Sequence, residues 1–201
     1  MGYRLGVDLG TTYTAAAVHV DGRTEMLGLG IRAMQVPSVV FVRDDGEIVV
    51  GEAAEQQGAA DPARLVREFK RRVGDSVPLV VGGSPYSAQA LTARLLAWVV
   101  TIATERQGGP PEHVCVTHPA NWGPFKRDLL GQAVELAGLR GVPVTDWKVG
   151  LVAAKAALTG RIRLHESSSR TPEEVVTELY EKVFGTDPDL MAETEGSPGE
   201  R

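Results

Sequence analysis

The stretch GVDLGTTYTAAAV, residues 6–18, most constrains what this chain can fold into, because an aspartate, glycines and threonines interrupt two apolar runs. A hairpin that only reverses the chain needs little more than an Asn-Gly or Asp-Gly pair. Here Gly10 would let the backbone approach a ligand closely, and the successive N–H groups of residues 11–13 could point at phosphate oxygens. The residues alone leave two interpretations open: a phosphate-binding loop, or a plain hairpin whose threonines favour strands.

Asp8 ends the first apolar run, residues 3–8, which has the pattern of a buried strand. A carboxylate beside a phosphate is unfavourable by itself, since the two negative charges repel each other. The arrangement becomes favourable when Mg²⁺ lies between them, usually with water among its ligands. The motif therefore predicts Mg²⁺ together with a phosphate-bearing ligand.

Composition argues against several other classes of protein. No run approaches the roughly 18 apolar residues that a membrane-spanning helix needs, and the N-terminus lacks a basic-then-apolar leader. We therefore expect a cytoplasmic protein with no membrane partner. The single Cys115 lies in an apolar run, which indicates a small core residue rather than a disulfide or a metal ligand.

The net charge of −5 is unevenly distributed. Residues 166–201 hold ten acidic and three basic residues, which leaves 18 basic and 16 acidic residues for the rest of the chain. Binding to a phosphodiester backbone needs clustered Lys and Arg, so we expect no nucleic-acid partner. The densest basic stretch, residues 64–72, is expected to be one face of a helix.

The first part of the chain has mostly the pattern of strands. The expected strands cover residues 3–8, 12–20, 23–27, 37–42 and 47–50. The first three should form an antiparallel meander, and the last two a hairpin around the turn at residues 44–46. Residues 51–72 are rich in Ala, Glu, Gln and Arg, which predicts helical pieces broken at Gly58 and Pro62.

The next part of the chain alternates between helix and strand. The expected elements are a helix at 87–106 with Ser87 as its N-cap, a strand at 113–118, a helix at 124–137 closed by Gly138, and a strand at 142–145. Strand, helix and strand at this spacing form a βαβ unit. The predicted fold class is therefore α/β, with a β-meander followed by βαβ.

Five stretches, in the same order, resemble the DnaK-type, seventy-kilodalton heat-shock chaperone family, whose ATPase domain belongs to the actin-like and sugar-kinase superfamily. They are YRLGVDLGTTYTAAAV, IRAMQVPSVVFV, VGEAAEQQ, VREFKRRVGD and VCVTHPANWGPFKRDLLGQAVELAGLRGVPV. The resemblance is to divergent members of the actinobacterial type. It implies the first lobe of an actin-like ATPase (ribonuclease H-like) fold over residues 1–160.

The resemblance also implies a nucleotide site for ATP and Mg²⁺. Asp8 would be a catalytic residue and would face Mg²⁺ through water. Gly10, Thr11, Thr12 and Tyr13 would form the first phosphate loop.

Three further roles follow from the resemblance. Lys70 would be catalytic by orienting the attacking water or the γ-phosphate; without the resemblance, it is one member of a solvated basic face. Pro119, with Arg127 near it, would act as a switch between the nucleotide-binding and substrate-binding domains. Without the resemblance, Pro119 only ends a strand.

The match to the family fails after about residue 144. The family continues with a Glu-Pro pair where this chain has Val149 and Gly150, and no second phosphate loop or glycine-rich adenosine motif follows. We therefore expect a truncated domain without its second lobe, which leaves open whether the chain is an enzyme. Residues 161–170 are expected to be a polar linker, 171–185 an amphipathic helix and 186–201 an acidic disordered tail.

Three functions remain open from the sequence. The first is a chaperone-type domain that binds Mg·ATP weakly and hydrolyses it little or not at all, with a protein partner or a second copy completing the cleft. The second is a non-catalytic protein-interaction module that retains the fold. The third is a sugar-kinase-like phosphotransferase, which the lack of a later Asp-rich loop disfavours.

Overall fold

The computed structural model describes residues 2–21, 23–31, 33–119, 122–139 and 144–147, and it opens with the predicted meander. β1 (Arg4–Leu9), β2 (Tyr13–Val20) and β3 (Arg23–Leu27) pair antiparallel in sequence order. The apolar side chains of β1 are buried, as its continuous apolar run predicted. The meander is therefore confirmed.

A later part of the chain completes the main sheet. β10 (His113–Thr117) pairs parallel with β1, and β11 (Val144–Trp147) pairs parallel with β10, giving the order β11-β10-β1-β2-β3. α3 (Pro124–Leu136) connects β10 to β11, so the predicted βαβ unit is confirmed. Gly138 follows the end of α3 with a φ of 86°, the left-handed conformation expected of a C′ glycine.

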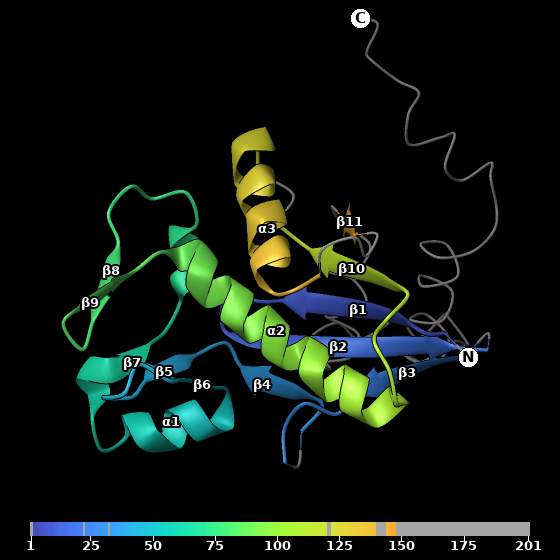
Figure 1. The fold of residues 1–201 in the computed structure, drawn as a ribbon, viewed down its shortest axis with the longest axis horizontal. Coiled ribbons are helices and arrows are strands. Elements are labelled where there is room, and N and C mark those ends of the chain that lie inside the picture. The colour runs from blue at the N-terminus through green and yellow to red at the C-terminus, as the bar shows by residue number, and fades with distance from the viewer. Residues whose placement is uncertain (1, 22, 32, 120–121, 140–143, 148–201) are drawn as a thin grey trace, which may run out of the picture.

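α2 (Ala88–Gln107) crosses one face of this sheet (Figure 1). It begins at the predicted N-cap, where the Ser87 hydroxyl oxygen accepts a hydrogen bond of 3.1 Å from the Ala90 N–H. It ends before Gly108, whose φ is 76°. The buried side of α2 shares one apolar cluster with β1 and β10, which includes Leu5, Val7, Leu91, Leu95, Leu96, Val99 and Val114.

The single strand predicted at residues 37–42 is wrong, because the chain here belongs to two sheets. β4 (Gln35–Pro37) pairs with β2, whereas β5 (Val40–Val42) pairs with β6 (Ile48–Val50) in a separate sheet. The break falls at Ser38, whose N–H donates to the Thr12 carbonyl at 2.8 Å. The hairpin of β5 and β6 is confirmed.

The prediction for residues 51–72 is correct only in part. α1 (Glu52–Gly58) ends at Gly58, and the 3₁₀ turn η1 (Pro62–Arg64) begins at Pro62. However, β7 (Leu65–Val66) pairs with β5, and η2 (Phe69–Arg72) is another 3₁₀ turn. The helix face expected at 64–72 is therefore wrong, because pairing with a distant strand overrides the local helix propensity.

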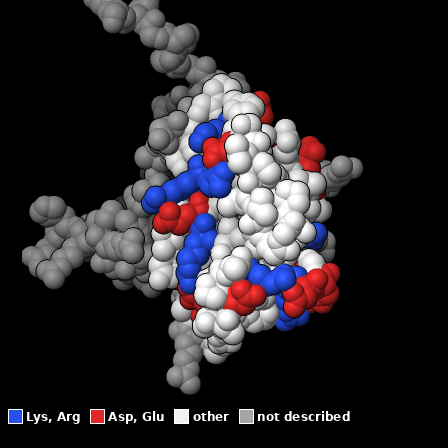
Figure 2. Space-filling view, turned by 90° about the vertical axis from the view of Figure 1, so that its left-hand side faces the viewer, with Lys and Arg blue, Asp and Glu red and all other residues white. Residues whose placement is uncertain are grey.

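The arginines of this segment form ion pairs across the surface. Acidic and basic side chains are interspersed on the face shown in Figure 2, rather than gathered by sign. The pairs with distances of 2.6–3.3 Å are Arg64 with Asp61, Arg67 with Glu55, Arg71 with Glu68, and Arg72 with Asp75.

Three further observations complete the fold. β8 (Leu79–Val81) and β9 (Ser84–Tyr86) form a hairpin that the sequence analysis missed, although Gly82 and Gly83 supply the two positive φ angles that a tight hairpin turn favours. Cys115 is fully buried, which confirms it as a core residue. In the described part of the chain, the helices are too short or too polar to cross a bilayer.

Several predictions fall on residues without a described structure. Residues 142–143 of the predicted strand, Val149 and Gly150, the linker, the amphipathic helix and the tail all lie outside the described residues.

Candidate functional site

The candidate site lies at the edge of the main sheet where β1 and its parallel neighbour β10 both end. The register of the two strands pairs Val7 with Val116, which brings Asp8 beside Thr117. The Thr117 hydroxyl donates a hydrogen bond to Asp8 Oδ1 at 2.8 Å. In α/β sheets, ligands bind beyond the carboxyl ends of parallel strands, so this edge is a favourable place for a ligand site.

The predicted phosphate loop continues directly from Asp8. Gly10 is buried and its N–H donates to the Asp8 carbonyl at 3.0 Å, whereas Thr11 is half-buried and Thr12 and Tyr13 are exposed. The loop therefore reaches from the buried strand end to the surface within a few residues. Such a loop could contact a ligand that arrives from solvent, because its first residues are held by the sheet and its last residues are exposed.

The loop rests on β4, a contact that the sequence analysis missed. The register of β2 and β4 pairs Tyr13 with Pro37, and the backbone N–H of Ser38 donates a hydrogen bond to the Thr12 carbonyl. Behind the loop, the buried hydroxyls of Thr14 and Ser38 are hydrogen-bonded at 2.9 Å. The sequence analysis made the Pro-Ser pair the start of one strand, whereas Pro37 ends β4 and Ser38 follows it, and the pair gave no sign of this partner.

Lys70 joins this loop from η2. Lys70 is only 7% exposed, which excludes the interpretation of Lys70 as part of a solvated basic face. The ammonium group instead donates to the backbone carbonyl of Leu9. The structure thus places Lys70 against Leu9, the residue that follows Asp8, although Asp8 and Lys70 are far apart in the sequence.

Trp122 connects Lys70 with Pro119. The Lys70 Nζ lies 5.6 Å from the centroid of the Trp122 ring, within the range of a cation–π interaction, and the Lys126 Nζ lies 5.9 Å from the same centroid. The backbone N–H of Trp122 donates to the Pro119 carbonyl at 3.0 Å. The His118 ring stacks near Trp122 with centroids 6.3 Å apart.

The predicted switch residues take up neighbouring positions. Pro119 is the second residue after the end of β10, and its carbonyl also lies 2.8 Å from His118 Nδ1. Arg127 is half-buried in the first turn of α3, where its backbone N–H donates to the Gly123 carbonyl at 3.2 Å. Both residues therefore lie after β10, on the same connection as Trp122.

Sequence reasoning missed Thr117 and Trp122 as members of the site. The signal for Thr117 was weak: a hydroxyl at the end of the apolar strand that precedes Pro119. Trp122 had no pattern of its own, because its contacts with Lys70 depend on how η2 packs beside the end of β10.

The side chains around Asp8 determine how Mg²⁺ could bind at this site. Over the described residues, no three His, Cys, Asp or Glu side chains lie together as a metal-binding group. Mg²⁺ commonly keeps several waters and is bound through one or two carboxylates plus the phosphates of a nucleotide. Asp8 at the mouth of a phosphate loop fits that mode of binding, in which the protein supplies few of the ligands.

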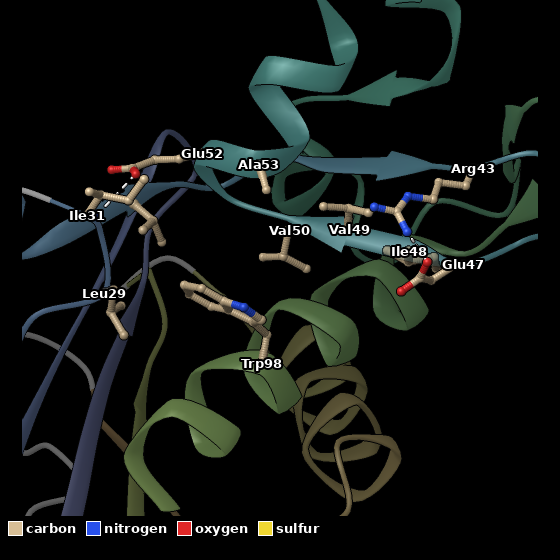
Figure 3. Close-up of a pocket in the computed structure, with 11 residues that line it drawn as sticks. Leu29, Ile31, Arg43, Glu47, Ile48, Val49, Val50, Glu52, Ala53 and Trp98 are labelled. Atoms are coloured by element: carbon tan, nitrogen blue, oxygen red, sulfur yellow. Dashed lines mark hydrogen bonds and ion pairs between the residues drawn. The ribbon is translucent and has the colours of Figure 1, made fainter. Parts of the chain in front are cut away.

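A separate pocket of about 360 Å³ lies between α2 and the β3–β4 connection (Figure 3). Trp98 of α2 faces Leu29, Ile31 and Val50 across it. At its rim, the Ile31 N–H donates to Glu52 Oε2 at 3.2 Å, which ties the β3–β4 connection to α1. This pocket draws its lining from different elements than the phosphate loop.

Comparisons with known proteins agree with the resemblance. The sequence pattern of the family "Hsp70 protein" matches residues 4–81. The chaperone protein DnaK of Elusimicrobium minutum (strain Pei191) is 34% identical over 146 residues, which are 71% of this chain and 24% of that protein. DnaK of Endomicrobium trichonymphae is 30% identical over 146 residues, again 71% of this chain and 24% of that protein.

DnaK of Cenarchaeum symbiosum (strain A) is also 30% identical, over 71% of this chain and 22% of its own length. The chain thus spans about a quarter of the length of the curated relatives that it matches. The mixed α/β architecture, with its meander and βαβ unit, is consistent with the actin-like ATPase fold of the family. The chain therefore belongs to the Hsp70 protein family, the seventy-kilodalton heat-shock chaperones that its sequence motifs resemble.

Proposed function

We propose that this chain is a chaperone-type nucleotide-binding domain that binds Mg·ATP weakly through the loop at residues 8–13 and hydrolyses it little or not at all. The observation that carries the proposal is that Lys70 lies against this loop. Its ammonium group donates to the backbone carbonyl of Leu9, the residue between Asp8 and Gly10. Relatives that are DnaK chaperones support the same class of ligand.

The roles of the residues follow from their chemistry. The N–H groups and hydroxyls of Thr11 and Thr12 would bind phosphate oxygens, and Lys70 would add a positive charge beside them. Asp8 would hold Mg²⁺ through water. When bound, Mg²⁺ supplies positive charge that offsets the charge of the phosphates.

Weak binding follows from the small number of ligand contacts. Each hydrogen bond to a charged group contributes about 1.5–3 kcal/mol, whereas association costs about 4 kcal/mol or more. For a nucleotide that contacts only this loop, we therefore expect dissociation constants in the millimolar range. We expect slow hydrolysis because two features of the family's site are missing from this sequence: the glutamate, whose position is taken by Val149, and the second phosphate loop, so that one loop alone is insufficient for catalysis.

A second candidate function is a non-catalytic interaction module. Several large apolar side chains are exposed on the described surface, namely Ile31, Met34, Val77, Val80, Phe125 and Leu136. Such side chains are common at protein interfaces, so a protein partner or a second copy of the chain could bury them.

Calorimetric titration of the purified chain with Mg·ATP tests the proposal. We expect saturable heat that Asp8→Asn and Thr11→Ala abolish. Thr101→Ala is the matched control, because the Thr101 hydroxyl is bonded to the Ala97 carbonyl on the exposed side of α2 and should leave binding unchanged. Absence of saturable heat at several millimolar Mg·ATP would refute nucleotide binding and favour the interaction module.

Hydrolysis is tested in the same preparation. We expect phosphate release near the background rate, and no rise in the Val149→Glu variant. A clear rise in that variant would contradict the proposal that one loop is insufficient for catalysis.

A further inference from the structure

We propose that Thr117 is a positioning residue that orients the Asp8 carboxylate for Mg²⁺, so that it strengthens the binding of Mg·nucleotide but not of nucleotide alone. The inference rests on the proposed function. It concerns a residue outside the phosphate loop, on a strand that enters the sheet more than a hundred residues later in the chain.

The first argument is the rigidity of both supports. β1 lies between β10 and β2, and β10 lies between β1 and β11, so both strands are held on both edges. The parallel register continues over four residue pairs, from Arg4 with His113 to Val7 with Val116. The next position along each strand carries Asp8 and Thr117. Because the two backbones are held in this register, the Cα atoms of Asp8 and Thr117 are held side by side, within reach of a hydrogen bond between their side chains.

The second argument is the chemistry of the contact. A threonine hydroxyl has one proton to donate, and here it goes to Asp8 Oδ1 at 2.8 Å. Hydrogen bonds to ionised acceptors are among the stronger ones in proteins. Threonine is also β-branched, so its χ1 angle is restricted and the donated proton comes from a defined direction. The bond therefore fixes the plane of the carboxylate before a cation arrives.

The third argument is the burial of Thr117. Its side chain is 5% exposed and continues the fully buried run of Val114, Cys115 and Val116. A valine would fill the same space without bringing a hydroxyl out of water. The hydroxyl at this position finds its partner on Asp8, in the neighbouring strand. Ligands whose orientation is set by such a partner bind metal more strongly than ligands that must be ordered on binding.

The test compares Thr117→Val with Thr117→Ser, because valine removes only the hydroxyl and serine keeps it. Binding of ADP is followed by the NMR shifts of the Gly10 and Thr11 amides, once in EDTA and once across a Mg²⁺ titration. We expect Thr117→Val to raise the Mg²⁺ concentration at half-effect by fivefold or more, with ADP affinity in EDTA unchanged. Thr117→Ser should restore the wild-type Mg²⁺ response.

The matched control is Thr92→Val. Thr92 is also a buried threonine, and its hydroxyl donates to the Ala88 carbonyl at 2.8 Å within α2. The control should lower thermal stability without changing the Mg²⁺ response. If Thr117→Val behaves like this control, or weakens ADP binding equally with and without Mg²⁺, the role of Thr117 is structural and the inference is overturned.

Failure of the proposed function gives a different result. If the wild-type chain shows no saturable shift with ADP and Mg²⁺, the nucleotide site itself is refuted, and the role of Thr117 falls with it. If the wild-type chain responds to Mg²⁺ and Asp8→Asn does not, while Thr117→Val keeps the full response, only the inference about Thr117 is overturned.

Discussion

The ammonium group of Lys70 donates a hydrogen bond to the backbone carbonyl of Leu9, the residue between Asp8 and Gly10. The contact joins η2 to the loop that follows β1 across 61 positions of the chain. It gives Lys70 a structural role that does not depend on any ligand. The same side chain can therefore shape the loop and supply its positive charge.

Replacing Lys70 by methionine should destabilise the fold, because the Leu9 carbonyl loses a buried charged donor while the apolar stem is kept. We expect a loss of about 1–3 kcal/mol in the free energy of unfolding, measured from urea denaturation at constant m-value. Arg71→Met is the control, since Arg71 is exposed in the same turn and pairs only at the surface with Glu68. Equal midpoints for the two variants would contradict a structural role for Lys70.

The buried hydroxyl pair of Thr14 and Ser38 should behave as a coupled unit. Thr14→Val or Ser38→Ala alone leaves one buried hydroxyl without this partner, which should cost about 1–3 kcal/mol. The double variant should cost about 1 kcal/mol less than the sum of the two, because it removes both polar groups. A double-mutant cycle from thermal or urea unfolding measures the coupling. Strict additivity would show that the two hydroxyls act independently.

Glu52 should hold the β3–β4 connection in place through its bond to the Ile31 N–H. Glu52→Ala should increase the hydrogen-exchange rate of the Ile31 amide by roughly five- to tenfold, the equivalent of about 1 kcal/mol. Glu52→Gln keeps an acceptor oxygen and should stay near the wild-type rate. Glu55→Ala, on the same helix, should also leave this amide unchanged, as Glu55 pairs with Arg67 instead. Equal exchange in all variants would exclude the contact.

The stability of the fold should decrease below neutral pH through His113. Burial lowers the pKa of His113 below its ordinary value of 6.5, and the Arg4 guanidinium lowers it further. The register places Arg4 opposite His113 on the neighbouring strand. As the pH falls through about 6.5, the unfolded chain takes up a proton that the folded chain does not, so the free energy of unfolding decreases until the folded pKa is reached.

His113→Gln should remove this part of the pH dependence. Urea denaturation between pH 7.5 and pH 5 measures it, and the variant should lose less stability over that range than the wild-type chain. An identical slope in both chains would show that His113 takes up its proton equally well in the folded and unfolded states.

Local sequence signals predicted the elements whose stability is local. Ser87 marked the start of α2 correctly because an N-cap needs only a hydroxyl three residues before an N–H. Gly138 marked the end of α3 because a left-handed residue is a local property of the chain. The meander followed from three apolar runs joined by short turns.

The errors arose where distant pairing decides the structure. Residues 65–66 lie in a stretch with helix-forming composition, yet they form a strand because they pair with Val40 and Phe41 of β5. The burial of Lys70 also depends on a distant contact, with the Leu9 carbonyl, whereas the charge pattern of residues 64–72 by itself groups Lys70 with the arginines that pair at the surface. Thr117 could be assigned only once the register of β10 on β1 was known.

Asp8 and Thr117 are 109 positions apart, and this separation has a consequence for the order of events during synthesis. At roughly 5–20 residues per second, Thr117 is added about 5–20 s after Asp8. Throughout that interval the nascent meander has no partner on the β10 side of β1, which leaves an open strand edge available for mispairing. The hydrogen bond between the two side chains can therefore form only after β10 has paired with β1 and closed that edge. The candidate site is completed only when the main sheet is completed.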